Sequence, residues 1–172
     1  SPDGKTQSYL AEVGDHYELF LKDLTSSTEN QVTKESDSWI LSHLWSPTGK
    51  TIAMTAKANR LRVMAVDTHA MKTLATATES GIRGVTWSTD GNWLAYLRVS
   101  RNGFGSIWLC SAVDGEPFQV TTDDYQDGSV AFDREGHYLF FTSARDFKFD
   151  GFEFRRRIYA LLLQNDAVSP IA

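Results

Sequence analysis

The feature that constrains this chain most is a short glycine turn that recurs four times. The copies are SPDGK from Ser1, SPTGK from Ser46, STDGN from Ser88 and DREGH from Asp133. They begin 45, 42 and 45 residues apart, and regular spacing of this size is typical of a repeat architecture. Each copy has glycine at its fourth position, where a tight turn between strands needs a residue that tolerates positive φ. The chain is therefore expected to contain four copies of one structural unit.

The segments between the turns have the alternation of β-strands. An apolar run follows each later turn directly: TIAMTA from Thr51, WLAYLR from Trp93 and YLFFTS from Tyr138. A second run follows a polar loop, and in it apolar residues two apart share a side: Leu19 with Leu21, Val63 with Ala65, Ile107 with Leu109, and Ile158 with Ala160. An inner strand ending in an aromatic residue precedes each later turn, and a weaker outer segment closes each unit. No stretch has sustained helical periodicity.

These units predict an all-β fold built from β-propeller blades, each a four-stranded antiparallel sheet of about 40–45 residues. Residues 1–172 are expected to form a single partial propeller domain, with units at about 1–37, 38–81, 82–128 and 129–172. The first unit lacks its inner strand and the last its outer strand, so about four blades of a larger ring of about six to eight are expected. A β-sandwich is the alternative, but it leaves the regular spacing of the turns unexplained.

Composition excludes several classes of function. The net charge is −5 and the basic residues are mostly scattered, which argues against a nucleic-acid partner. Cys110 is the one cysteine, so neither an intrachain disulfide nor a thiolate zinc cluster can form, and its apolar context predicts a buried strand position. No apolar run approaches the roughly 20 residues of a membrane-spanning helix. We expect no cofactor.

The sequence motifs typical of catalytic and metal-binding sites predict neither kind of site in this chain. The nucleophile motif G-x-S-x-G and the zinc motif H-E-x-x-H are both missing from the sequence. TTDDYQDGS places Asp123, Asp124 and Asp127 close together, but Tyr125 occupies a position that a calcium loop needs for a ligand, which favours a solvated turn. His43 lies in a predicted inner strand and is expected to be a hydrogen-bonded structural residue.

The segment SARDFKFDGFEFRRRIY is the most informative polar region. Its aromatic residues alternate with charges and precede three consecutive arginines: Phe147, Phe149, Phe152 and Phe154, then Arg155, Arg156 and Arg157. It is either a structured insertion whose arginines are solvated or paired with Asp146, Asp150 or Glu153, or a loop at a channel mouth. In the second interpretation, guanidinium groups bind peptide carboxylates or dock a neighbouring domain. The candidate binding residues are Arg145, Arg155 and Arg156.

The repeated turn and strand resemble the TolB/tricorn type of propeller repeat. Two longer stretches, SPDGKTQSYLAEVGDHYELFLKDL and AFDREGHYLFFTSARDFKFDGFEFRRRIYALLLQNDAVSP, resemble the tricorn protease-like family. The resemblance covers essentially the whole chain and implies late blades of the second propeller, which precede the catalytic module. Gln7 and Ser8 depart from the pattern, because the other units have apolar residues there. This departure predicts a thinner core contact in the first unit or an unusual neighbour.

The resemblance implies a segment of a tricorn-like serine peptidase that filters peptides and docks neighbouring domains without being catalytic itself. Its partners would be peptides or the parent protein's PDZ and protease module, and exposed blade faces are expected to self-associate. The implied location is cytoplasmic, with periplasmic or secreted as the alternative. Two other functions stay open: a non-enzymatic TolB-like protein-binding propeller, and the propeller of a prolyl oligopeptidase-like peptidase.

Overall fold

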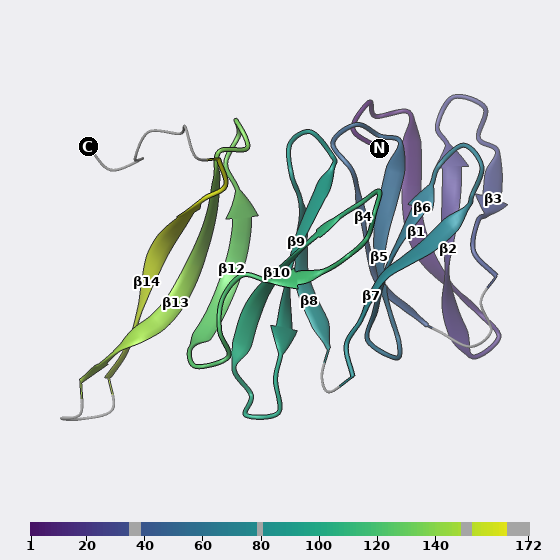
Figure 1. The fold of residues 1–172 in the computed structure, drawn as a ribbon. Coiled ribbons are helices and arrows are strands. Elements are labelled where there is room, and N and C mark those ends of the chain that lie inside the picture. The colour runs from purple at the N-terminus through teal and green to yellow at the C-terminus, as the bar shows by residue number, and fades with distance from the viewer. Residues whose placement is uncertain (35–38, 79–80, 149–152, 165–172) are drawn as a thin grey trace. The chain divides into compact units, whose positions relative to one another are not determined.

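A computed structural model of the chain describes residues 1–34, 39–78, 81–148 and 153–164. The chain divides into two compact units, Ser1–Ala77 and Thr78–Ala172. Each unit contains two antiparallel sheets in which strands that follow one another along the chain are hydrogen-bonded neighbours (Figure 1). No helix occurs among the described residues, and thus none there is long and apolar enough to cross a membrane. The expected all-β, antiparallel architecture is confirmed.

The first unit has a three-stranded and a four-stranded sheet. The three-stranded sheet has the order β1-β2-β3, comprising β1 (Thr6–Val13), β2 (His16–Asp23) and β3 (Glu29–Gln31). The four-stranded sheet has the order β4-β5-β6-β7, comprising β4 (Ile40–Trp45), β5 (Thr51–Ala56), β6 (Arg60–Ala65) and β7 (Met71–Thr76). β4 and β7 cover the segments expected from the sequence to be the inner and outer strands of the second repeat.

The second unit has a four-stranded and a three-stranded sheet. The first of these has the order β8-β9-β10-β11, comprising β8 (Ile82–Trp87), β9 (Trp93–Val99), β10 (Gly105–Ser111) and β11 (Phe118–Gln119). The other has the order β12-β13-β14, comprising β12 (Gln126–Phe132), β13 (Tyr138–Lys148) and β14 (Glu153–Leu162). β13 and β14 are longer than the strands of the other sheets, because the arginine-rich segment extends their hairpin (Figure 1).

The recurring glycines make the turns that the sequence predicts. Gly4, Gly49, Gly91 and Gly136 have φ values of +70°, +71°, +72° and +77°. In three of the turns the glycine N–H donates to the carbonyl oxygen of the first residue, as in the 3.0 Å bond from Gly49 to Ser46. A side chain with a Cβ would be strained in this left-handed region, which explains why glycine recurs at this position.

Each unit has an apolar core to which both of its sheets contribute. Leu19, Leu21, Ile52 and Met64 are among the buried residues of the first core, and Ile107, Leu109, Leu139 and Phe141 are among those of the second. The alternation expected from the sequence holds in β2 and β10. In β14 the opposite face is packed: Tyr159 and Leu161 contact the core, whereas Ile158 is 76% exposed. Periodicity shows which residues share a face, but the packing of the neighbouring sheet decides which face is covered.

The polar residue Ser8 has hydrogen-bonding partners in the neighbouring sheet of the first unit. Trp45 Nε1 donates a 2.7 Å hydrogen bond to Ser8 Oγ, which is also hydrogen-bonded to His43 Nε2 at 2.8 Å. Burial lowers the pKa of His43 below its ordinary value, because desolvation disfavours the charged imidazole. The prediction of a hydrogen-bonded His43 is confirmed, and the unusual neighbour expected for Ser8 is this pair.

Candidate functional site

Arg145 lies in β13, and three aromatic rings surround its guanidinium group. Its Cζ lies 5.0 Å from the ring centroid of Tyr125, 5.1 Å from that of Tyr159 and 5.7 Å from that of Phe141. Its Nε also donates a 3.0 Å hydrogen bond to Ser143 Oγ. Cation–π contacts of this kind stabilise a guanidinium group that is partly removed from water. Arg145 therefore contributes to the packing of its own blade, and a role in binding peptides stays a prediction.

Asp127 faces Arg145 from β12, and its carboxylate is fully buried. The distance from Asp127 Oδ2 to Arg145 Nη2 is 3.8 Å, and neither carboxylate oxygen has a hydrogen bond among the described residues. The expected solvated turn is correct for Asp123 and Asp124, which are exposed, but wrong for Asp127. The physical reason is that β12 begins at Gln126, so Asp127 belongs to the sheet and no longer to the turn.

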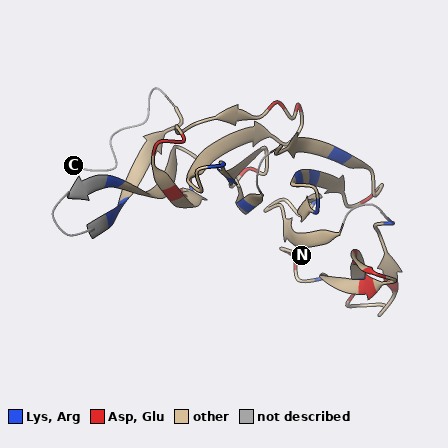
Figure 2. Ribbon diagram, turned by 90° about the horizontal axis from the view of Figure 1, so that it is seen from below, with Lys and Arg blue, Asp and Glu red and all other residues tan. Residues whose placement is uncertain are grey.

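The arginine run lies on the extended part of the β13–β14 hairpin. Arg155, Arg156 and Arg157 are exposed, and Arg155 is opposite Asp146 in the strand register. Figure 2 shows basic residues on both strands of this hairpin. Phe147 pairs with Phe154 in the register, whereas Phe149, Asp150 and Phe152 lie outside the described residues. The segment is thus an extension of two strands, and the arginines lie on its solvent-exposed surface.

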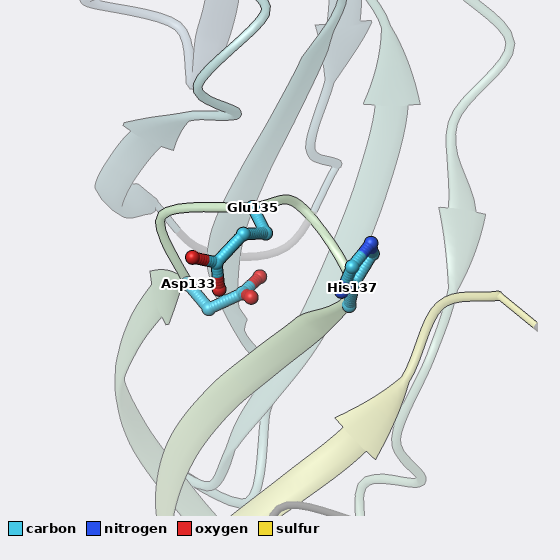
Figure 3. A group of neighbouring side chains, drawn as sticks. All are labelled: Asp133, Glu135 and His137. Atoms are coloured by element: carbon cyan, nitrogen blue, oxygen red, sulfur yellow. The ribbon is translucent and has the colours of Figure 1, made fainter. Parts of the chain in front are cut away.

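The fourth glycine turn brings together three side chains that the sequence analysis did not single out as a group. Asp133, Glu135 and His137 each offer one ligand atom, and these atoms lie within 4.8 Å of one another. Figure 3 shows the carboxylates of Asp133 and Glu135 turned toward each other, with His137 immediately before β13. Sequence motifs for metal sites did not reveal the group. The available signal was the replacement of S-P-D-G-K by D-R-E-G-H, which places a possible ligand at alternate turn positions.

A cleft adjoins this turn within the second unit. It has a volume of about 360 Å³, and its lining includes the turn residues Asp90 and Glu135 and the apolar side chains of Trp93, Phe118 and Phe132. Trp93 and Phe118 meet edge to face, with 6.2 Å between their ring centroids. The volume is within the range of small ligand pockets, and its polar groups come mainly from the glycine turns.

The first unit contains a linked set of charged and polar groups at the start of β2. Asp15 Oδ1 lies 3.0 Å from His16 Nδ1, and His16 Nε2 lies 3.0 Å from Glu18 Oε1. Glu18 is fully buried and accepts a hydrogen bond from the hydroxyl of Thr33. The hydrogen bond to Asp15, assisted by the charge of Glu18, raises the pKa of His16. The set has two carboxylates and one imidazole, and its one hydroxyl bonds to Glu18 rather than to the histidine, so it lacks the arrangement of a nucleophilic triad.

Cys110 is fully buried in β10, as its apolar context predicts. Burial raises the pKa of its thiol to about 11, because the thiolate would lose its hydration. Since the thiolate is the nucleophilic form, a thiol in this environment is inert at neutral pH. Cys110 is therefore a packing residue.

Comparison with known proteins gives sequence relatives among peptidases. No protein-family model matches the chain. The chain is 31% identical over 100 residues to a tricorn-like protease C-terminal subunit of Sulfurisphaera tokodaii, covering 58% of this chain and 12% of that protein. It is 29% identical over 100 residues to a tricorn protease homolog of Saccharolobus solfataricus, covering 58% of this chain and 9% of that one. It is also 23% identical over 144 residues to the uncharacterized peptidase YuxL of Bacillus subtilis, covering 83% of this chain and 21% of that protein. The chain thus spans about a fifth or less of these relatives.

Solved structures define the fold. The tricorn protease crystal structure matches 96% of this chain with a TM-score of 0.81 and 14% identity, over 18% of its own length. TolB from Acinetobacter baumannii matches 97% of this chain with a TM-score of 0.64 and 20% identity, over 41% of its length. The sheets are therefore blades of a partial β-propeller, as predicted. The chain is similar to tricorn-like proteases in sequence and to the tricorn protease in fold, so the resemblance inferred from its repeated turns is confirmed.

Proposed function

We propose that this chain belongs to a tricorn-like serine peptidase, in which it admits and filters peptides and docks the protease module. The observation that carries the proposal is the exposed run of Arg155 and Arg156 on propeller blades related in sequence to tricorn-like proteases. A guanidinium group binds a carboxylate through two parallel hydrogen bonds, so each of these exposed arginines, which project from opposite faces of β14, suits the C-terminus of a peptide. The chain contributes no catalytic group to this function.

The test uses the full-length parent protein and one peptide substrate with either a free or an amidated C-terminus. Changing Arg155→Ala together with Arg156→Ala should lower kcat/KM for the free-carboxylate peptide by up to about fivefold per arginine, because exposed charge pairs contribute roughly 0.2–1 kcal/mol. The amidated peptide should be cleaved as before. Arg134→Ala, an exposed arginine in the fourth glycine turn, is the matched control. Equal losses for both peptides, or no loss, would dismiss carboxylate recognition by the hairpin.

The two alternative functions are distinguished by the reading frame after Ala172. A PDZ domain and a tail-specific-protease module would support the proposal. A stop codon would favour the non-enzymatic TolB-like propeller, an alternative that the fold similarity to TolB keeps open. An α/β-hydrolase domain would favour a prolyl oligopeptidase-like peptidase. By the same resemblance we propose a cytoplasmic location, which cell fractionation would test.

We further propose that the isolated chain self-associates through an exposed blade face. Ile158 is 76% exposed and Leu162 is 45% exposed, both on β14, and large apolar side chains at the surface favour association. Light scattering after gel filtration should show species larger than a monomer, and Ile158→Ser should reduce them. Val113→Ser, at a side chain that is 69% exposed in the loop after β10, is the control. A monomeric wild-type chain would contradict this proposal.

A further inference from the structure

Three of the four glycine turns share one internal side-chain hydrogen bond, and the residues of the fourth turn cannot form it. In the first three turns the hydroxyl of the first residue is hydrogen-bonded to the side chain of the third: Ser1 to Asp3 at 2.6 Å, Ser46 to Thr48 at 3.0 Å and Ser88 to Asp90 at 2.5 Å. The backbone of the turn therefore directs the first and third side chains toward each other in every copy. The chemistry of these two positions determines what can lie between them.

In the fourth turn both positions are carboxylates. Asp133 and Glu135 are acceptors only when they are ionised, so neither can supply the proton that joins the pair in the other turns. Asp133 keeps the other role of the first residue, because its Oδ1 accepts the N–H of Tyr138 at 2.9 Å, as Ser88 Oγ accepts that of Trp93. This bond fixes the carboxylate of Asp133 within the turn. Two facing negative charges repel each other, and a cation between them would relieve that repulsion.

The fifth position of the turn supplies a third ligand atom. It is occupied by Lys5, Lys50 and Asn92 in the first three turns and by His137 in the fourth. A lysine would supply a positive charge beside the carboxylates, whereas a neutral imidazole supplies a nitrogen lone pair. The ligand atoms of Asp133, Glu135 and His137 lie within 4.8 Å of one another. The first and fifth turn positions thus differ from all the other copies in the direction that favours a metal ion, and the third is a carboxylate, as it is in the first and third turns.

We propose that Asp133, Glu135 and His137 bind a divalent transition-metal ion of the Zn²⁺ class. Carboxylate oxygens and imidazole nitrogens bind Zn²⁺ at about 2.0–2.2 Å, which places ligand atoms of a tetrahedral site about 3.4 Å apart. Glu135 is exposed and His137 half-buried, so small rotations of these side chains can close the remaining distance. Three protein ligands leave at least one coordination position for water or another ligand. Because Glu135 also lines the cleft, the ion would be bound at the wall of that cleft.

The proposal is independent of the proposed peptidase role and is tested by direct binding. Calorimetric titration of the metal-free 172-residue chain with Zn²⁺ at pH 7 should show one saturable site. Glu135→Gln and His137→Asn should each weaken binding by at least about tenfold, since even residues that only orient a ligand contribute that much. Glu116→Gln and His69→Asn remove the same kinds of group at exposed positions elsewhere in the chain and should leave the affinity unchanged.

Three outcomes of the Zn²⁺ titrations would overturn the proposal. These are the absence of a saturable site, undiminished binding in both turn variants, and equal weakening in the control variants. Ca²⁺ provides a further comparison, because it prefers an all-oxygen site, whereas imidazole suits Zn²⁺. Ca²⁺ binding as tight as that of Zn²⁺ and insensitive to His137→Asn would exclude the proposed class of ion. Circular dichroism of each variant verifies that it keeps its fold.

Discussion

Gly105→Ala should destabilise the second unit, because there is no room for a methyl group at this position. Gly105 begins β10, and a Cβ built on it lies 2.7 Å from the backbone carbonyl oxygen of Asp127. Side-chain Cβ atoms in folded proteins stay at least 3.0 Å from such atoms. The obstacle is backbone, which cannot rotate away as a side chain can. Either β10 or β12 must therefore move to accept the alanine.

The magnitude follows from two opposing effects. Overpacking a well-packed site costs about 1–3 kcal/mol. Alanine also loses less backbone freedom than glycine on folding, which stabilises the folded state by about 0.5–1 kcal/mol. Gly128→Ala is a matched control, because its Cβ would lie 3.4 Å from the hydroxyl of Thr142, close to ordinary contact. The entropic gain is common to both variants, so the difference between their free energies of unfolding isolates the overpacking cost of about 1–3 kcal/mol.

Urea unfolding followed by tryptophan fluorescence measures this difference. With a dependence on urea of about 2 kcal/mol per molar, the midpoint of Gly105→Ala should lie about 0.5–1.5 M below that of Gly128→Ala. A change in the slope would show that the variant also alters how cooperatively the chain unfolds. Equal midpoints for the two variants would refute the reasoning, since they would mean that the close approach of β10 and β12 does not resist a methyl group.

Three further predictions concern titratable groups. The hydrogen bond to Asp15 raises the pKa of His16, so its stabilisation is present below the unfolded value of about 6.5 and is lost as the pH rises through the folded value. Burial lowers the pKa of His43, so its contribution to the stability of the fold is present above the unfolded value of about 6.5 and is lost as the pH falls through the folded value. Urea midpoints measured from pH 5 to 8 test both statements. His16→Asn should remove the loss of stability at the alkaline end of this range, and His43→Asn should remove the loss of stability at the acidic end. A variant whose midpoints depend on pH as those of the wild-type chain do would contradict the role given to that histidine. Cys110, with its pKa raised to about 11, should react with a thiol reagent at pH 8 only after unfolding, and rapid reaction of the folded chain would exclude its burial.

The sequence predicts those features that depend on local geometry. The turns were predictable because a strained backbone position selects glycine whatever surrounds it, as Gly49 and Gly91 show. The strands were predictable because alternation reports which residues share a face. The burial of Cys110 followed from its apolar neighbours along the strand.

Features that depend on contacts between strands were not predictable in this way. Asp127 looks like a loop residue in the sequence, and its burial depends on where β12 begins and on Arg145 from the next strand. The exposure of Ile158 follows from the face that β14 presents to its neighbour, which alternation leaves undetermined. The carboxylates of Asp133 and Glu135 lie close together because both residues belong to a tight turn. Alternation along a strand would predict only that two residues at this spacing share a face.

The position of the arginine run has a consequence for the solubility of the chain. In the described part of the chain β14 is the last strand of its sheet (Figure 1). A strand at the edge of a sheet offers backbone groups to other extended chains, and positively charged side chains on it oppose such pairing. Arg155, Arg156 and Arg157 are consecutive and exposed, so the charge faces both sides of the strand. We therefore expect any aggregates of this chain to remain compact assemblies, because electrostatic repulsion between like strands hinders the growth of cross-β fibrils.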